Sequence, residues 1–170
     1  MTTIAWDGNM LAADRRVSFG QGRMGEITKI ARRESDGALI GSSGATALCQ
    51  ALERWFLAGE VGDPPKLDVD KDNAAAGFIV RPDGAIDDVS SSGIARIESK
   101  LYARGAGADY ALGAMSMGAD AGRDVEVASE WDNGTGDGVN TLLLRPNYAA
   151  LTPHDLQARV AGALAAQTPR

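Results

Sequence analysis

The first segment of the chain restricts the fold more than any other. Residues 2–7 and 9–14 are two short β-like runs, and the Asp7-Gly8 pair between them is a typical hairpin turn. A methionine before a small residue is usually removed, and its removal here would leave Thr2 as the terminal residue. Such a threonine carries a hydroxyl nucleophile beside a free amine that can act as its base. The segment therefore predicts a β-hairpin with a candidate nucleophile at its start; the alternative is that Met-Thr occurs here by chance.

The remaining strand and helix signals occur in separate blocks. Two more hairpins and two further strands are predicted, at residues 26–33 with 38–42 around Ser35-Asp36-Gly37, at 76–80 with 85–89 around Pro82-Asp83-Gly84, and at 94–104 and 139–145. Helices are predicted over Ala45–Ala58, 108–118, 119–131 and, after the N-cap pair Thr152-Pro153, over 153–166. This order predicts an α+β fold in which sheets pack against helical layers.

Three glycine-rich or polar stretches are predicted to connect these elements. Gly20, Gly22 and Gly25 indicate a flexible connection, residues 59–73 indicate an acidic loop, and 132–138 a polar one. Asp68-x-Asp70-x-Asp72 has the spacing of a calcium loop. Asn73 replaces the required glycine and Ile79 the closing glutamate, so we predict a solvated loop and no metal site.

Composition narrows the class of protein. A chain of 170 residues suits one domain, spanning 1–170, with a substantial core. A net charge of −6 argues against a nucleic-acid or anionic membrane surface, and no stretch is apolar enough to span a bilayer. The single cysteine, Cys49, allows no internal disulfide, and clusters of histidine and cysteine typical of metal sites are absent from the sequence. We expect a cytoplasmic protein without a cofactor.

Several short stretches occur in an order and spacing that resemble one known family. They are Thr2-Thr3-Ile4, Leu11-Ala12-Ala13-Asp14-Arg15-Arg16, Thr28-Lys29-Ile30, Gly41–Ala47, Gly105–Ala114 and Asp132-Asn133-Gly134-Thr135-Gly136. The chain resembles a proteasome β-type subunit of the N-terminal nucleophile hydrolases and the peptidase subunit of the bacterial heat-shock protease. Compact bacterial and phage proteasome homologues are the most similar group. The resemblance implies a four-layer α-β-β-α sandwich, with a shortened second helix region at residues 59–73.

The resemblance also assigns roles to four catalytic positions. Thr2 corresponds to the nucleophile, and its α-amine, with an ordinary pKa of about 7.7–8.0, can accept a proton at neutral pH. Asp14 and Lys29 match the buried acid and lysine beside the threonine; the alternative is a structural ion pair between strands. Gly44 matches the residue whose N–H group stabilises the oxyanion, although a glycine before a helix is common in other settings.

Other positions match the distal part of the site and the substrate pocket. Asp132 and Thr135 match an acid and a hydroxyl that orient groups near the terminal amine; the alternative is an ordinary turn. Ser18 matches a residue that holds the substrate backbone. The first specificity pocket would be lined by Val17, Ala31, Ser42 and Thr46, whose small uncharged side chains favour a neutral substrate side chain. Ala106 departs from the family pattern, because members usually carry there a serine that hydrogen-bonds the threonine amine.

The resemblance implies a threonine-type endopeptidase inside a homo-oligomeric barrel of two stacked rings, hexameric or heptameric, that degrades unfolded polypeptides. It allows an ATP-dependent unfoldase as a partner, which no residue identifies. Two alternatives stay open at this point. One is an amidase that uses the same site on a small molecule, and the other is a catalytically silent ring protein used for assembly or binding.

Overall fold

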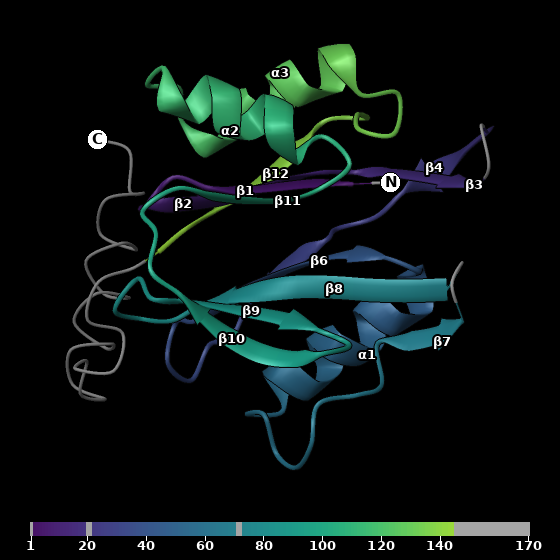
Figure 1. The fold of residues 1–170 in the computed structure, drawn as a ribbon, viewed down its shortest axis with the longest axis vertical. Helices are drawn as coiled ribbons and strands as arrows, with labels where there is room; N and C mark the ends of the chain where they lie inside the picture. The colour runs from purple at the N-terminus through teal and green to yellow at the C-terminus, as the bar shows by residue number, and fades with distance from the viewer. Residues whose placement is uncertain (1, 20–21, 71–72, 145–170) are drawn as a thin grey trace, which may run out of the picture.

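Two antiparallel sheets lie face to face between helices in the computed structural model, which describes residues 2–19, 22–70 and 73–144 (Figure 1). The first sheet has the order β11-β1-β2-β12, formed by Tyr102–Gly105, Thr3–Trp6, Met10–Asp14 and Val139–Leu143. The second has the order β10-β9-β8-β6-β5, formed by Gly93–Ile97, Ile86–Ser90, Asn73–Val80, Leu39–Gly44 and Ile30–Arg32. The β1 strand, which begins directly after Thr2, is therefore an interior strand of its sheet.

Helices cover the outer faces of both sheets. The pair α2 (Ala108–Ser116) and α3 (Ala121–Trp131) lies on the first sheet, and α1 (Thr46–Leu57) lies on the second (Figure 1). Among the described residues, α1 is the only helix on its side, in agreement with the predicted shortening of that layer. The predicted four-layer α-β-β-α arrangement is thus confirmed.

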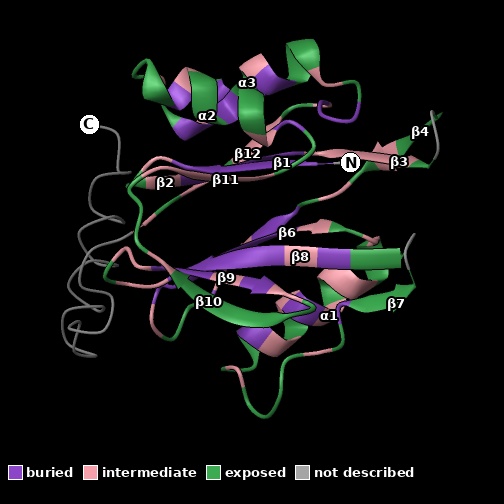
Figure 2. Ribbon diagram, in the orientation of Figure 1, coloured by how far each residue is buried: buried purple, intermediate pink, exposed green. Residues whose placement is uncertain are grey.

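Burial on both faces of β1 and β2 explains why these strands lie inside the sandwich (Figure 2). Side chains alternate between the two faces of a strand. Ile4 and Trp6 enter the core between the sheets, together with Leu11 of β2. On the opposite face, Ala5 and Ala12 pack against α2 and α3 in a separate cluster. Small side chains on this second face let the helices approach the sheet closely.

Most predicted elements are present, including the three hairpins, both middle helices and the strand after residue 138. Two connections differ from the prediction. The glycine-rich segment predicted as flexible contains a β-hairpin of β3 (Arg16–Phe19) and β4 (Gly22–Glu26). The acidic loop contains a short strand, β7 (Asp68–Asp70), because its backbone pairs with β8. The predicted helix over 153–166 lies outside the described residues.

The described helices are also too short or too polar to cross a lipid bilayer.

Candidate active site

Thr2 is held at the start of β1 by the neighbouring strand β11. Its carbonyl oxygen accepts a hydrogen bond of 2.7 Å from the backbone N–H of Ala106, and Thr3 pairs with Gly105 in the sheet. A Cβ atom at Gly105 would lie 1.9 Å from that same carbonyl oxygen, and Gly105 has a φ of +106°. Only glycine allows β11 to approach so closely, so this residue type sets where the Thr2 backbone lies.

Asp14, at the end of β2, connects four segments of the site. Its carboxylate is fully buried. Oδ1 accepts hydrogen bonds from Lys29 Nζ at 2.8 Å and from the backbone N–H of Thr3 at 2.9 Å. Oδ2 accepts from the backbone N–H groups of Arg16 and Gly136, each at 3.1 Å. With four donors, Asp14 fixes the residue that follows Thr2 and the ammonium group at the same time.

Lys29 brings a positive charge to the same region from the residue before β5. The side chain is almost completely buried and pairs with Asp14. Burial lowers the pKa of Lys29, and the neighbouring Asp14 carboxylate opposes this by attraction and hydrogen bonding. Thr2 and Lys29 both line one pocket. The predicted grouping of Thr2, Asp14 and Lys29 is therefore present in the folded chain.

Asp132 and Thr135 lie in the loop after α3 and form a hydrogen-bonded chain with Thr3. The Thr135 hydroxyl donates to Asp132 Oδ2 at 2.6 Å, and its oxygen lies 2.6 Å from Thr3 Oγ1. Since Thr135 has one hydroxyl proton, Thr3 must be the donor in the second contact. These bonds run to the residue after the candidate nucleophile, so they orient β1 from its other side.

Gly44 has a geometry that requires glycine. It is the last residue of β6, has a φ of +121°, and a Cβ atom there would lie 2.2 Å from the carbonyl oxygen of Ala74. The helix α1 begins two residues later, at Thr46, with Ala45 as its N-cap. Gly44 lines the pocket that contains Thr2 and Lys29, and also a second pocket, which Thr2 and Ala106 line too. Gly44 thus borders the space around Thr2, and its role as the oxyanion residue stays a prediction.

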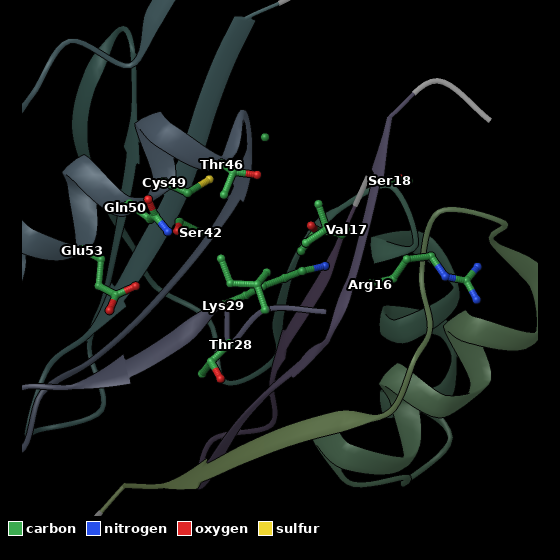
Figure 3. Close-up of a pocket in the computed structure, with 13 residues that line it drawn as sticks. Arg16, Val17, Ser18, Thr28, Lys29, Ser42, Thr46, Cys49, Gln50 and Glu53 are labelled. Carbon is green, nitrogen blue, oxygen red and sulfur yellow. The ribbon is translucent and has the colours of Figure 1, made fainter. Parts of the chain in front are cut away.

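The pocket beside Thr2 has two walls (Figure 3). Side chains of β6 and α1 form one wall, and residues of β3 and the segment before β5 form the other. The lining residues are Thr2, Arg16, Val17, Ser18, Ile27, Thr28, Lys29, Ser42, Gly44, Thr46, Cys49, Gln50 and Glu53. Four residues predicted to bind substrate, Val17, Ser18, Ser42 and Thr46, are among them.

The fifth residue predicted for this pocket, Ala31, is not one of its lining residues. Ala31 pairs with Ile40 in the second sheet and packs against the core cluster between that sheet and α1. Side chains alternate between the two faces of a strand, and this alternation directs Ala31 toward the core. The prediction from the family resemblance did not take the alternation into account.

Sequence reasoning missed several residues of the pocket, above all Gln50 and Glu53. Thr46, Gln50 and Glu53 occupy positions i, i+4 and i+7 of α1, which form one stripe along a helix. This polar stripe could have been read from the sequence, but only the apolar face of the helix was used. Cys49 also lines the pocket, where burial raises the pKa of its thiol and favours the neutral form.

Comparison with solved structures confirms the fold. BPH from Thiobacillus denitrificans in complex with epoxomicin has 24% identity and a TM-score of 0.63, and the match covers 85% of this chain and 99% of that one. A second structure of Thiobacillus denitrificans BPH gives the same identity and TM-score, and the match covers 86% of this chain and 99% of that one. Eukaryotic HslV from Trypanosoma brucei has 18% identity and a TM-score of 0.58, over 85% and 98%. No protein-family profile and no curated protein sequence matches this chain.

These similarities confirm, at the level of the fold, the resemblance to proteasome β-type subunits and the heat-shock protease peptidase.

Proposed function

We propose that this chain is a threonine-type endopeptidase in which Thr2, after removal of Met1, is the nucleophile. The observation that carries the proposal is the position of Thr2 in a pocket that Lys29 also lines, with the Lys29 ammonium held by the buried carboxylate of Asp14. A terminal threonine needs no separate base, because its own amine lies beside its hydroxyl. The shared fold with HslV and with BPH, which was solved in complex with epoxomicin, supports the same function.

Acylation is the first half of the proposed reaction. The Thr2 amine accepts the hydroxyl proton while Oγ1 forms a bond to the carbonyl carbon of the substrate peptide. Lys29, a nearby cation, favours the developing alkoxide by attraction. The backbone N–H of Gly44 donates to the oxyanion of the tetrahedral intermediate. The intermediate collapses, the carbon–nitrogen bond breaks, and the protonated amine gives its proton to the leaving peptide nitrogen.

Deacylation restores the enzyme. The Thr2 amine accepts a proton from a water molecule, whose oxygen attacks the ester carbon. The ester bond breaks, a carboxylic acid leaves, and the proton returns to Oγ1. Asp14 and the Thr3–Thr135–Asp132 chain are positioning residues in this scheme, since they fix β1 and Lys29. They touch neither the substrate nor the reacting atoms.

We further propose that the peptidase acts in a homo-oligomeric barrel of two stacked rings, hexameric or heptameric, on unfolded polypeptides. An ATP-dependent unfoldase is the partner class that such a barrel would need for folded substrates. The fold shared with HslV supports the barrel. A monomer that hydrolyses only small amides would contradict this part of the proposal.

Ala106 favours a second candidate, a catalytically silent ring protein. Its methyl group lies beside Thr2, lines the second pocket, and cannot donate the hydrogen bond of a serine. Intact mass spectrometry before and after treatment with epoxomicin distinguishes the peptidase from the silent ring protein. The peptidase should lack Met1 and gain the mass of one inhibitor, and Thr2→Ala should gain none. Retention of Met1 without any adduct would support the silent protein and overturn the peptidase.

A further inference from the structure

The pocket beside Thr2 contains three charged side chains, and two of them are already neutralised. Lys29 forms its ion pair with Asp14 at 2.8 Å. Arg16 Nε lies 3.2 Å from a carboxylate oxygen of Asp137. Both cations that line the pocket are therefore members of ion pairs.

Glu53 is the third charged side chain, and it differs from the other two. It extends from α1 toward the pocket, opposite Val17 and Arg16, with Lys29 between the two walls (Figure 3). Within the ranges that the structure describes, no hydrogen bond or ion pair involves its carboxylate. The charged group that acts on it is Arg54, the next residue of the helix, which is exposed and lowers its pKa by less than burial raises it.

Partial burial makes this unpaired carboxylate costly. Loss of solvent raises the pKa of Glu53, because the charged form is poorly hydrated beside the pocket wall. A cationic ligand group would replace the lost hydration by a charge-assisted hydrogen bond. The surrounding groups suit such a ligand. Thr28 and Gln50 supply polar atoms near Glu53, whereas Val17 and Ile27 supply aliphatic surface.

A lysine or arginine side chain has this combination of an aliphatic stem and a charged end. We propose that the pocket selects polypeptides with lysine or arginine at the residue whose carbonyl Thr2 attacks, and that Glu53 is the specificity-determining residue. The inference rests on the proposed peptidase function. It replaces the prediction, made from the small lining residues in the sequence, that the pocket binds a neutral substrate side chain. The charge of Glu53 outweighs those residues because an unpaired ionic partner discriminates more strongly than small uncharged walls.

The test compares peptides that differ only in the residue before a fluorogenic leaving group: lysine, leucine or glutamate. The full-length protein should hydrolyse the lysine peptide with a kcat/KM about 10- to 100-fold above that of the leucine peptide. Glu53→Gln should lower this ratio about tenfold, mainly through the KM of the lysine peptide. Glu53→Lys should reverse the order and favour the glutamate peptide. Glu98→Gln, an exposed glutamate away from the pocket, is the matched control and should keep the wild-type ratio.

The outcomes separate this inference from the function on which it rests. Labelling of Thr2 by epoxomicin, together with a lysine-to-leucine ratio that Glu53→Gln and Glu53→Lys leave unchanged, overturns the assignment of Glu53 and keeps the peptidase. Preference of the wild type for the leucine peptide does the same. Absence of both labelling and hydrolysis overturns the two proposals together. A ratio that follows the charge at position 53 supports both.

Discussion

Lys29 donates a hydrogen bond of 2.8 Å to Asp14, and both side chains are almost completely buried. Removal of one member of such a pair leaves a buried charge without a partner, at a cost of about 3–5 kcal/mol. We therefore expect Asp14→Asn to lower the free energy of unfolding by that amount in a denaturant titration. The double variant Asp14→Asn/Lys29→Met should recover much of the loss. A double variant less stable than Asp14→Asn would show that the pair is not the cause.

Activity should depend on the positive charge of Lys29. Lys29→Met removes the cation that favours the Thr2 alkoxide, and we expect kcat to fall by about 10²–10³-fold. The measurement is hydrolysis of a fluorogenic peptide by protein whose assembly matches that of the wild type. Lys29→Arg keeps the charge and should retain more activity than Lys29→Met. Equal activities of the two variants would exclude an electrostatic role for this residue.

The hydroxyl of Thr3 should contribute to both stability and turnover. Thr3→Val removes the donor to Thr135 and keeps the shape of the side chain, so we expect a loss of about 1 kcal/mol in the free energy of unfolding. Because Thr3 directly follows Thr2, kcat should fall several-fold while KM changes little. Thr3→Ser restores the hydroxyl and should rescue kcat. Failure of this rescue would mean that the methyl group, not the hydrogen bond, positions β1.

Close packing at Gly107 provides a separate test of the same region. A Cβ atom there would lie 2.2 Å from Thr3 Oγ1 and 3.1 Å from Thr135 Oγ1. We expect Gly107→Ala to destabilise the protein by about 1–3 kcal/mol, as overpacking does, and to reduce peptide hydrolysis. Gly113→Ala is the matched control in α2, since no atom lies within 4 Å of its Cβ position. It should raise stability by up to about 1 kcal/mol through helix propensity, leaving hydrolysis unchanged.

The buried carboxyl group of Asp124 should make the free energy of unfolding depend on pH. Its two carboxylate oxygens are buried without a hydrogen-bond partner in the described structure, and burial beside Asp120 and Asp7 raises its pKa from 3.8 to about 7. The folded state therefore holds a proton that the unfolded chain releases above about pH 4. Its contribution to stability is complete below that pH and is lost as pH rises toward 7.

The measurement is the free energy of unfolding of the wild type and of Asp124→Asn between pH 4.5 and 8. Asp124→Asn cannot release this proton, so its stability relative to the wild type should rise with pH. The gain should be on the order of a few kcal/mol at pH 8. A constant difference across this range would show that Asp124 does not titrate as the buried geometry requires.

Local sequence patterns predicted those elements that local chemistry determines. The turn pairs Asp7-Gly8 and Asp83-Gly84, together with β-type runs on either side, define hairpins without help from distant residues. The β3–β4 hairpin was not predicted, because its stability depends on a remote residue. Arg16 and Arg23 both contact Asp137, more than a hundred residues later.

In the candidate site, too, some residues could be predicted from the local sequence and others depend on remote packing. Thr2, Asp14 and Lys29 could be grouped by resemblance, since their sequence context matches a known pattern. The sequence shows that Glu53 belongs to a polar stripe of the helix, but the stripe alone does not distinguish a pocket wall from a solvated face. Its role depends on which face of α1 meets the pocket, and this follows from packing of the opposite face, with Leu52 and Phe56, against the second sheet.

The interior position of β1 in its sheet determines when the candidate site around Thr2 can form during synthesis. Thr2 is synthesised before the residues whose contacts fix its surroundings, which are Asp14, Gly105–Ala106 and Gly136. The nascent chain cannot assemble this arrangement until residue 136 has left the ribosome. An incomplete chain therefore holds Thr2 without the neighbours that complete the candidate site.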